Sequence, residues 1–214
     1  MKFADFLIVL PKLLKEPLSS TDAHLLMAPP ERADVIRNID IATYNPRKAA
    51  VLMLIYPRNE QAHLILILRN SYKGVHSSQI AFPGGKVEPD DASYCMAALR
   101  ETHEEIGVQP EKINVVRDFS EIFIPPSNFI VFPFLGFSNA ELIFNPDPEE
   151  VAGLIEFPLA DFLDDATVVV NQMPTSYSKW IDVPTFKIGN HYVWGATAMI
   201  MSELKVMLKK VLSE

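Results

Sequence analysis

The most informative stretch of the sequence runs from Gly84 to Val108 and reads GGKVEPDDASYCMAALRETHEEIGV. Residues 92–106 contain no glycine or proline and are rich in alanine, leucine and glutamate, so they predict a helix. Asp90, Asp91 and Ser93 are candidate caps for its first turn, and Gly107 is a residue that commonly ends a helix. A glycine pair, Gly84-Gly85, precedes the predicted helix and lets backbone groups approach a ligand closely.

Three carboxylates gather on this helix. Glu101, Glu104 and Glu105 stand at positions i, i+3 and i+4 and share one face. The expected core face on the opposite side consists of Cys95, Met96, Leu99 and Ile106. Like charges at this spacing repel, and a divalent cation such as Mg²⁺ relieves the repulsion because it prefers oxygen ligands. The alternative is a solvated acidic helix face. The glycine pair favours the metal site, and Arg100 is placed to pair with one glutamate.

The rest of the chain predicts an α+β fold with a mixed sheet. Apolar runs suited to strands alternate with loops that contain proline, and helices are expected at both ends of the chain. Residues 17–46 have the composition of a connecting arm with room for a short helix. The expected strands cover 48–55, 63–68, 113–116, 120–124, 129–137, 142–144, 151–157 and 185–188, and the last helix covers about 196–212.

Charge and cysteine content narrow the possible functions. The chain has 19 Lys and Arg against 27 Asp and Glu, a net charge of −8, which argues against a broad nucleic-acid surface. Cys95 is the only cysteine, so an internal disulfide and a zinc site built from cysteines are both excluded. A single thiol suits a reducing compartment, and we expect a cytoplasmic protein. The longest apolar run, 49–56, is too short for a membrane span.

The segment resembles the Nudix signature, Gly-x5-Glu-x7-Arg-Glu-U-x-Glu-Glu-x-Gly-U, in which U is apolar. The run from Arg100 to Val108 matches, with Thr102 at one apolar position. Asp91 stands where the signature has its first glutamate, and eight residues rather than seven separate it from Arg100. Both departures are features of the coenzyme A pyrophosphatase branch of the family, so they bear only on the structural role of that first acid.

A second pattern upstream is similar to the same branch, which carries Leu-Leu-Thr-x-Arg-Ser-x3-Arg-x3-Gly-x3-Phe-Pro-Gly-Gly. Arg69, Gln79 and the run 82–85 fit this pattern, whereas Gly74 and Ser78 replace its second arginine and its glycine. Weaker echoes follow at 125–129, 133–134, 150–151 and 193–197, so the similarity extends from about residue 45 onward.

The resemblance implies a Nudix α/β/α sandwich over residues 46–214, with residues 1–45 forming a helix and arm packed on it. It also implies metal-dependent hydrolysis of coenzyme A or an acyl-CoA to 4′-phosphopantetheine and adenosine 3′,5′-bisphosphate. Mg²⁺ or Mn²⁺ is the expected cofactor, and a small nucleotide-derived molecule is the expected partner. Hydrolysis of ADP-ribose, NADH or a nucleoside triphosphate is an alternative, as is a Nudix domain that binds a nucleotide without cleaving it. Oligomeric state is left open.

The same resemblance suggests roles for individual residues. Gly85, Glu101, Glu104 and Glu105 are the expected metal ligands, Arg100 their partner, and a triad carboxylate or Glu150 the proton acceptor. The residues expected to bind substrate are Arg69, Lys73, His76, Gln79, Ser127, Asn128 and Phe129. All of these except Gln79 have an alternative as a surface charge, a structural loop residue or a turn residue, and the alternative for Glu150 is an exposed acidic turn.

Overall fold

A computed structural model describes residues 1–70, 79–173 and 180–213. Its centre is an eight-stranded mixed sheet in which β1 (Arg47–Arg58) lies between β2 (Gln61–Arg69) and β7 (Phe129–Phe137). β1 and β2 form an antiparallel hairpin, and both turn residues, Asn59 and Glu60, have positive φ, as a tight hairpin turn requires. β1 pairs with β7 in parallel, so the predicted mixed sheet is confirmed.

The remaining strands of this sheet are arranged around the hairpin. β3 (Ile80–Ala81) and β8 (Val151–Pro158) pair with β2, and β4 (Gly84–Lys86) pairs with β1. β5 (Asn114–Asp118) and β6 (Ile122–Ile124) pair with β7. Pairing of β4 with β1 matters most for the site, because it fixes the glycine pair at the centre of the sheet.

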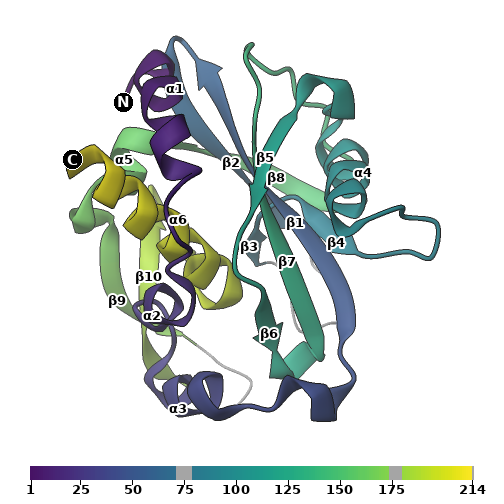
Figure 1. Ribbon diagram of the computed structural model, residues 1–214, viewed down its shortest axis with the longest axis vertical. Helices are drawn as coiled ribbons and strands as arrows, with labels where there is room; N and C mark the ends of the chain where they lie inside the picture. Colours follow the sequence, from purple (N-terminus) through teal and green to yellow (C-terminus); the bar gives the residue numbers. More distant parts are fainter. Residues whose placement is uncertain (71–78, 174–179, 214) are drawn as a thin grey trace.

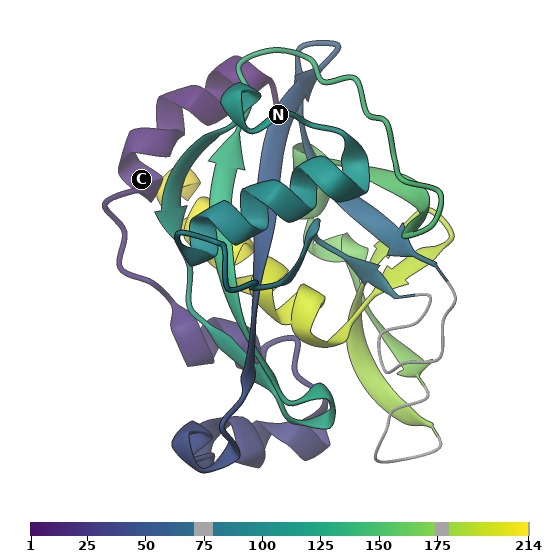
Figure 2. The same cartoon turned by 90° about the vertical axis from the view of Figure 1, so that its right-hand side faces the viewer.

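Helices cover both faces of the sheet, which accounts for the nearly continuous apolar sequence of β1. Leu52 and Leu54 face α4 (Tyr94–Ile106) in one core cluster. Met53 and Ile55 face the other cluster, which includes α1 (Phe3–Leu13) and α6 (Gly195–Ser213). Figures 1 and 2 show α4 on one side of the sheet and α1 and α6 on the other. The predicted layered α+β architecture is therefore confirmed.

The N-terminal region consists of helices that pack against the main body. α1 contacts α6 and β2, and it continues through Pro11 to Leu13. α2 (Ser20–Leu25) packs on α6, and α3 (Pro30–Asn38) and a 3-10 helix at Ile41–Tyr44 lead into β1. The arm thus contains more helix than its composition indicates. No helix in the described part of the chain is both long and apolar enough to cross a membrane.

A second sheet was only partly anticipated. It has the order β11-β10-β9, with β9 at Val168–Met173, β10 at Ile181–Ile188 and β11 at His191–Val193. It follows α5 (Leu159–Leu163), and β11 lies near β3 of the main sheet. The short 3-10 helices elsewhere cover Pro110–Lys112, Pro125–Ser127 and Asp165–Thr167.

The strand expected at 142–144 is wrong. This segment is irregular, and Phe144 packs edge-on against Tyr56 with ring centroids 5.2 Å apart. Leu142 and Phe144 pack against the core beside α4 without joining a ladder of backbone hydrogen bonds, whereas Ile143 is 88% exposed.

Candidate active site

Local sequence fixes both ends of α4. The Ser93 hydroxyl oxygen accepts a hydrogen bond from the Met96 N–H at 3.2 Å, which caps the first turn. Gly107 ends the helix in the left-handed region at φ 74°. Thr102, which occupies an apolar position of the pattern, is fully buried and donates its hydroxyl proton to the Ala98 carbonyl at 2.7 Å. The polar side chain is therefore satisfied within the helix.

The glycine pair brings the backbone of β4 against the carboxylates of α4. A Cβ atom at Gly85 would lie 2.4 Å from Oε2 of Glu101, and one at Gly84 would lie 2.3 Å from the Ala50 carbonyl oxygen. Gly84 also has φ of 145°, which other residues rarely adopt. The Glu101 carboxylate can therefore lie against the loop only because residue 85 is a glycine and has no Cβ atom.

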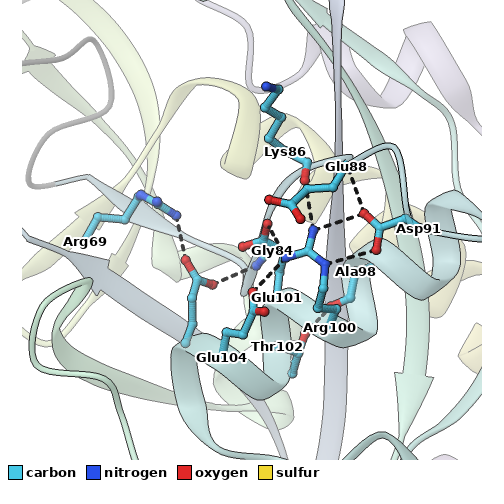
Figure 3. A network of polar contacts seen from close by, with 11 residues as sticks. Arg69, Gly84, Lys86, Glu88, Asp91, Ala98, Arg100, Glu101, Thr102 and Glu104 are labelled. Carbon is cyan, nitrogen blue, oxygen red and sulfur yellow. Dashed lines mark hydrogen bonds and ion pairs between the residues drawn. The ribbon is translucent and has the colours of Figure 1, made fainter.

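Arg100 joins the acidic groups of the loop and the helix (Figure 3). Its Nε and Nη2 each lie 3.0 Å from one oxygen of Asp91, and Nη2 also donates to the Lys86 carbonyl at 3.1 Å. Nη1 donates to Glu101 at 3.0 Å and to Glu104 at 2.7 Å. The hydrogen bonds from Arg100 hold the pKa of Asp91 below its ordinary value. Asp91 thus orients the arginine, which in turn positions two glutamates.

Glu105 is the buried acid of the cluster. Its side chain is 0% exposed, accepts from Arg69 Nη1 at 2.9 Å, and accepts from the Gly84 N–H at 2.8 Å. Burial raises its pKa to about 7, and the charges of Glu101 and Glu150 act in the same direction against the two donors. A carboxyl group that titrates near neutrality is suited to proton transfer.

The expected division of α4 into one acidic and one core face is wrong in two places. Glu105 lies among the buried residues of the helix with Ala98 and Thr102, whereas Glu104 is 52% exposed. Met96, expected in the core, is 47% exposed. Glu105 is buried because β4 and Arg69 approach closely and supply polar partners on the side of the helix that faces the sheet.

Glu150 joins the cluster from the start of β8. Its charge raises the pKa of both Glu101 and Glu105, for which burial is the larger cause. The Glu150 carbonyl accepts from the Asn70 N–H at 2.9 Å, immediately after β2. The structure therefore brings Arg69, Glu101, Glu105 and Glu150 together from three separate parts of the chain.

The remaining expected substrate residues are divided between the surroundings of the site, the start of β7 and the part of the chain outside the described ranges. Gln79 is next to the site, because its carbonyl accepts from the Arg69 N–H at 3.0 Å. Phe129 pairs with Arg47 at the start of β7, whereas Gly84 pairs with Val51, about 13 Å further along β1.

Two neighbours of Phe129 shape the turn before β7. The Ser127 carbonyl accepts from Arg47, and the Asn128 amide donates to the Tyr44 carbonyl. Lys73 and His76 lie outside the described residues.

The donor chemistry of the site fits a hard divalent cation, because it consists of carboxylates and backbone carbonyls. Across 1–70, 79–173 and 180–213, however, no three Asp, Glu, His or Cys side chains converge in a metal-binding arrangement. Arg100 occupies one oxygen each of Glu101 and Glu104, and Arg69 with Gly84 occupies both oxygens of Glu105. Oε2 of Glu101, which lies against Gly85, is not the oxygen that Arg100 binds.

Two contributors were not anticipated from the sequence. The Gly84 N–H is a donor to Glu105, and the Lys86 carbonyl is an acceptor for Arg100. Both are backbone groups, so residue type does not reveal them, although the glycine pair signals that backbone lies close to something.

Comparison with known proteins identifies the family to which the chain belongs. The NUDIX domain family model matches residues 46–176. A relative named Uncharacterized Nudix hydrolase NudL, from Enterobacter sp. (strain 638), is 34% identical over 171 residues, which cover 77% of this chain and 84% of the relative. The relative of the same name from Cronobacter sakazakii is 32% identical over 174 residues, which cover 78% and 85%.

A solved structure shows the same fold. The MutT/nudix family protein from Enterococcus faecalis superposes with a TM-score of 0.53 at 18% identity, covering 79% of this chain and 68% of that one. With the family model matched over more than half of the chain and relatives above 30% identity, the chain belongs to the Nudix family of pyrophosphohydrolases.

Proposed function

We propose that this Nudix hydrolase cleaves the pyrophosphate bond of coenzyme A or an acyl-CoA. The products would be 4′-phosphopantetheine, with or without its acyl group, and adenosine 3′,5′-bisphosphate. The proposal that the protein is a hydrolase is supported by the acidic cluster, in which the Glu101 carboxylate lies against Gly85 beside the buried Glu105. The choice of coenzyme A is supported by the resemblance of residues 65–85 and of the Asp91 spacing to the coenzyme A pyrophosphatase branch.

Nudix hydrolases generally use divalent metal ions, and Mg²⁺ or Mn²⁺ is proposed here. Glu101, Glu104, Glu105 and the Gly85 carbonyl would hold it. When bound, such a cation neutralises charge on a pyrophosphate and lowers the pKa of a water molecule. Arg100 orients Glu101 and Glu104 through its fork of donors.

The proton acceptor is proposed to be Glu105 or Glu150. Glu105 has a pKa of about 7, so it can accept a proton near neutral pH. Glu150 lies close enough for its charge to affect both glutamates, and it enters from the edge of a loop. If Glu105 is the acceptor, Glu105→Gln should remove the ionisation near pH 7 from the pH–rate profile, whereas Glu150→Gln should leave it in place.

Arg69 is the proposed contact for substrate phosphate, together with Lys73 and His76. In the structure Arg69 pairs with Glu105, and its side chain is 24% exposed, so part of it is accessible to a ligand. A phosphate group would share this arginine with Glu105. Ser127, Asn128 and Phe129 are proposed to act further from the reacting bond, because they lie in the turn before β7 and at its first residue, away from the glycine loop.

A substrate panel tests the proposal. Purified protein with Mg²⁺ or Mn²⁺ is assayed with coenzyme A, 3′-dephospho-CoA, ADP-ribose, NADH, diadenosine polyphosphates and nucleoside triphosphates. We expect the highest kcat/KM for coenzyme A or an acyl-CoA. The same assays on Glu101→Gln test the hydrolytic site. Glu111→Gln, a change at an exposed acid outside the site, is the control for that variant. Rapid hydrolysis of ADP-ribose without hydrolysis of coenzyme A would overturn the substrate while leaving the hydrolytic site in place.

A further inference from the structure

The loop that precedes β8 places Glu150 close to other carboxylates. Glu150 is exposed, and its charge acts on both Glu101 and Glu105. Like charges repel, so repulsion alone would move an exposed acidic loop away from the other two glutamates. The contacts that keep the loop here therefore oppose a destabilising arrangement of charge, and such local conflicts are typical of functional sites.

Asn70, the residue that follows β2, makes two hydrogen bonds to this loop. Its side-chain Nδ2 donates to the Pro148 carbonyl at 2.7 Å, and its backbone N–H donates to the Glu150 carbonyl at 2.9 Å. One residue thus fixes the loop both at Glu150 and two residues before it. Asn70 also follows Arg69, whose side chain binds the Glu105 carboxylate at 2.9 Å. The residues that contact Glu105 and the Glu150 loop are therefore neighbours in the chain.

A β-bulge in β8 determines which residue lies next to Asn70. The pairing of β8 with β2 shifts by one residue immediately before Arg69, which pairs with Val151. Ala152, which regular pairing would place opposite Arg69, is the extra residue of the bulge and is exposed. Val151 is buried in the core beside α4 instead. The bulge therefore moves Glu150 one residue closer to the end of β2, where Asn70 binds its carbonyl.

The earlier part of the same loop is attached to the end of α4. The Asn145 N–H donates to the Ile106 carbonyl at 2.9 Å. The Asp147 N–H donates to the Glu105 carbonyl at 3.0 Å. Both acceptors belong to the last turn of the helix, where carbonyl groups lack partners within the helix. The loop is thus held between α4 and the end of β2, which are the elements that carry Glu105 and Arg69.

We propose that Asn70 is a positioning residue, whose side-chain hydrogen bond to the Pro148 carbonyl keeps the Glu150 carboxylate where it acts in hydrolysis. This inference rests on the proposed function in one respect: Glu150 must contribute to the reaction, as the proton acceptor or through its charge. It does not depend on which nucleoside diphosphate derivative is the substrate. Asparagine suits the role because its carboxamide donates without a charge, whereas lysine would neutralise Glu150 and ionised aspartate has no donor.

Steady-state kinetics of the full chain test this role, with saturating Mg²⁺ and the fastest substrate of the panel. We expect Asn70→Ala to lower kcat ~10-fold and to change KM less than ~2-fold, because a displaced carboxylate affects the reaction more than substrate binding. Asn70→Ser keeps a donor on a shorter side chain, so its kcat should lie between those of Asn70→Ala and wild type. Asn114→Ala, the same change at an exposed asparagine of β5, is the control and should match wild type.

A double-mutant cycle with Glu150→Gln separates positioning from general support of the site. Glu150→Gln alone should lower kcat. In that background Asn70→Ala should lower kcat less than ~2-fold further, because the carboxylate that Asn70 positions has already been removed. A residue that supports the fold of the whole site would lower kcat by the same factor in both backgrounds.

Three results would overturn this inference, and they differ in what else they affect. Additive losses in the cycle would show that Asn70 does not act through Glu150. Wild-type kcat in Asn70→Ala beside a low kcat in Glu150→Gln would leave the role of Glu150 in place but remove its positioning residue. Wild-type kcat in Glu150→Gln would refute the contribution of Glu150 and this inference together. The coenzyme A assignment is decided separately, by the order of kcat/KM values in the panel.

Discussion

Replacing Glu105 with glutamine should stop turnover and, at alkaline pH, stabilise the metal-free protein. The effects on activity and on stability have opposite signs because the reaction needs the Glu105 carboxylate, whereas burial of its charged form destabilises the folded protein. We expect kcat to fall at least ~10²-fold, since the change keeps the shape of the side chain and removes its charge. A residue that merely supported the fold would lower stability and activity together.

The stability effect follows from the pKa. In the unfolded chain Glu105 loses its proton near pH 4.5, and in the folded protein near pH 7. Between these values the folded state holds more protons, so the free energy of unfolding falls as pH rises through this window. Above it the loss amounts to about 3 kcal/mol. Glutamine has one carbonyl oxygen and gives up one of two accepted hydrogen bonds, which costs about 1 kcal/mol. The variant should therefore gain about 2 kcal/mol at pH 8.

Urea denaturation in the presence of a chelator, at pH 5 and pH 8, measures this effect. Wild type should lose stability between the two pH values, whereas Glu105→Gln should lose much less, and the two proteins should have similar stability at pH 5. Glu111→Gln is the control and should follow wild type. The same pH dependence in wild type and Glu105→Gln would refute the assignment of Glu105 as a buried acid with a raised pKa. Unchanged turnover would refute its role in the reaction.

Three other changes test the surroundings of this acid. Arg100→Lys keeps the charge but loses the paired hydrogen bonds to Asp91, so kcat and metal affinity should both fall; wild-type values for both would exclude a positioning role. Gly85→Ala places a methyl group in the Glu101 carboxylate, so steady-state activity should fall ~10-fold or more with the fold retained by circular dichroism. Glu203→Ala removes the fully buried acceptor of hydrogen bonds from two serines and should lower the free energy of unfolding by ~2–3 kcal/mol in denaturant titrations, with kcat nearly unchanged.

The sequence was sufficient to predict the elements whose signals are local. α4 begins at a serine cap and ends at a glycine, and β7 covers the expected residues 129–137. The hairpin of β1 and β2 follows from two apolar runs and a short polar turn. The second sheet was harder to predict. β11 is only three residues long, and β9 is defined by its pairing with β10, which the local sequence does not reveal.

The site was predictable in residue type but not in environment. The spacing of the glutamates indicated a shared face, yet it did not reveal that Glu105 is buried and Glu104 exposed. That difference arises from Arg69 on β2 and the Gly84 N–H on β4, which are distant in sequence from the helix. Likewise, the pairing of Arg69 with Glu105 is a tertiary contact, so the sequence indicated a phosphate-binding cation but not its carboxylate partner.

The most direct test of the central claim is the initial rate of coenzyme A hydrolysis as a function of Mg²⁺ concentration, in wild type and in Glu101→Gln. We expect no hydrolysis without metal, a saturable rise in wild type with 4′-phosphopantetheine and adenosine 3′,5′-bisphosphate as products, and at least ~10²-fold lower rates in the variant at every concentration. A rate in wild type that is independent of metal, or a Glu101→Gln curve that superposes on it, would contradict the claim that these carboxylates hold the catalytic cation.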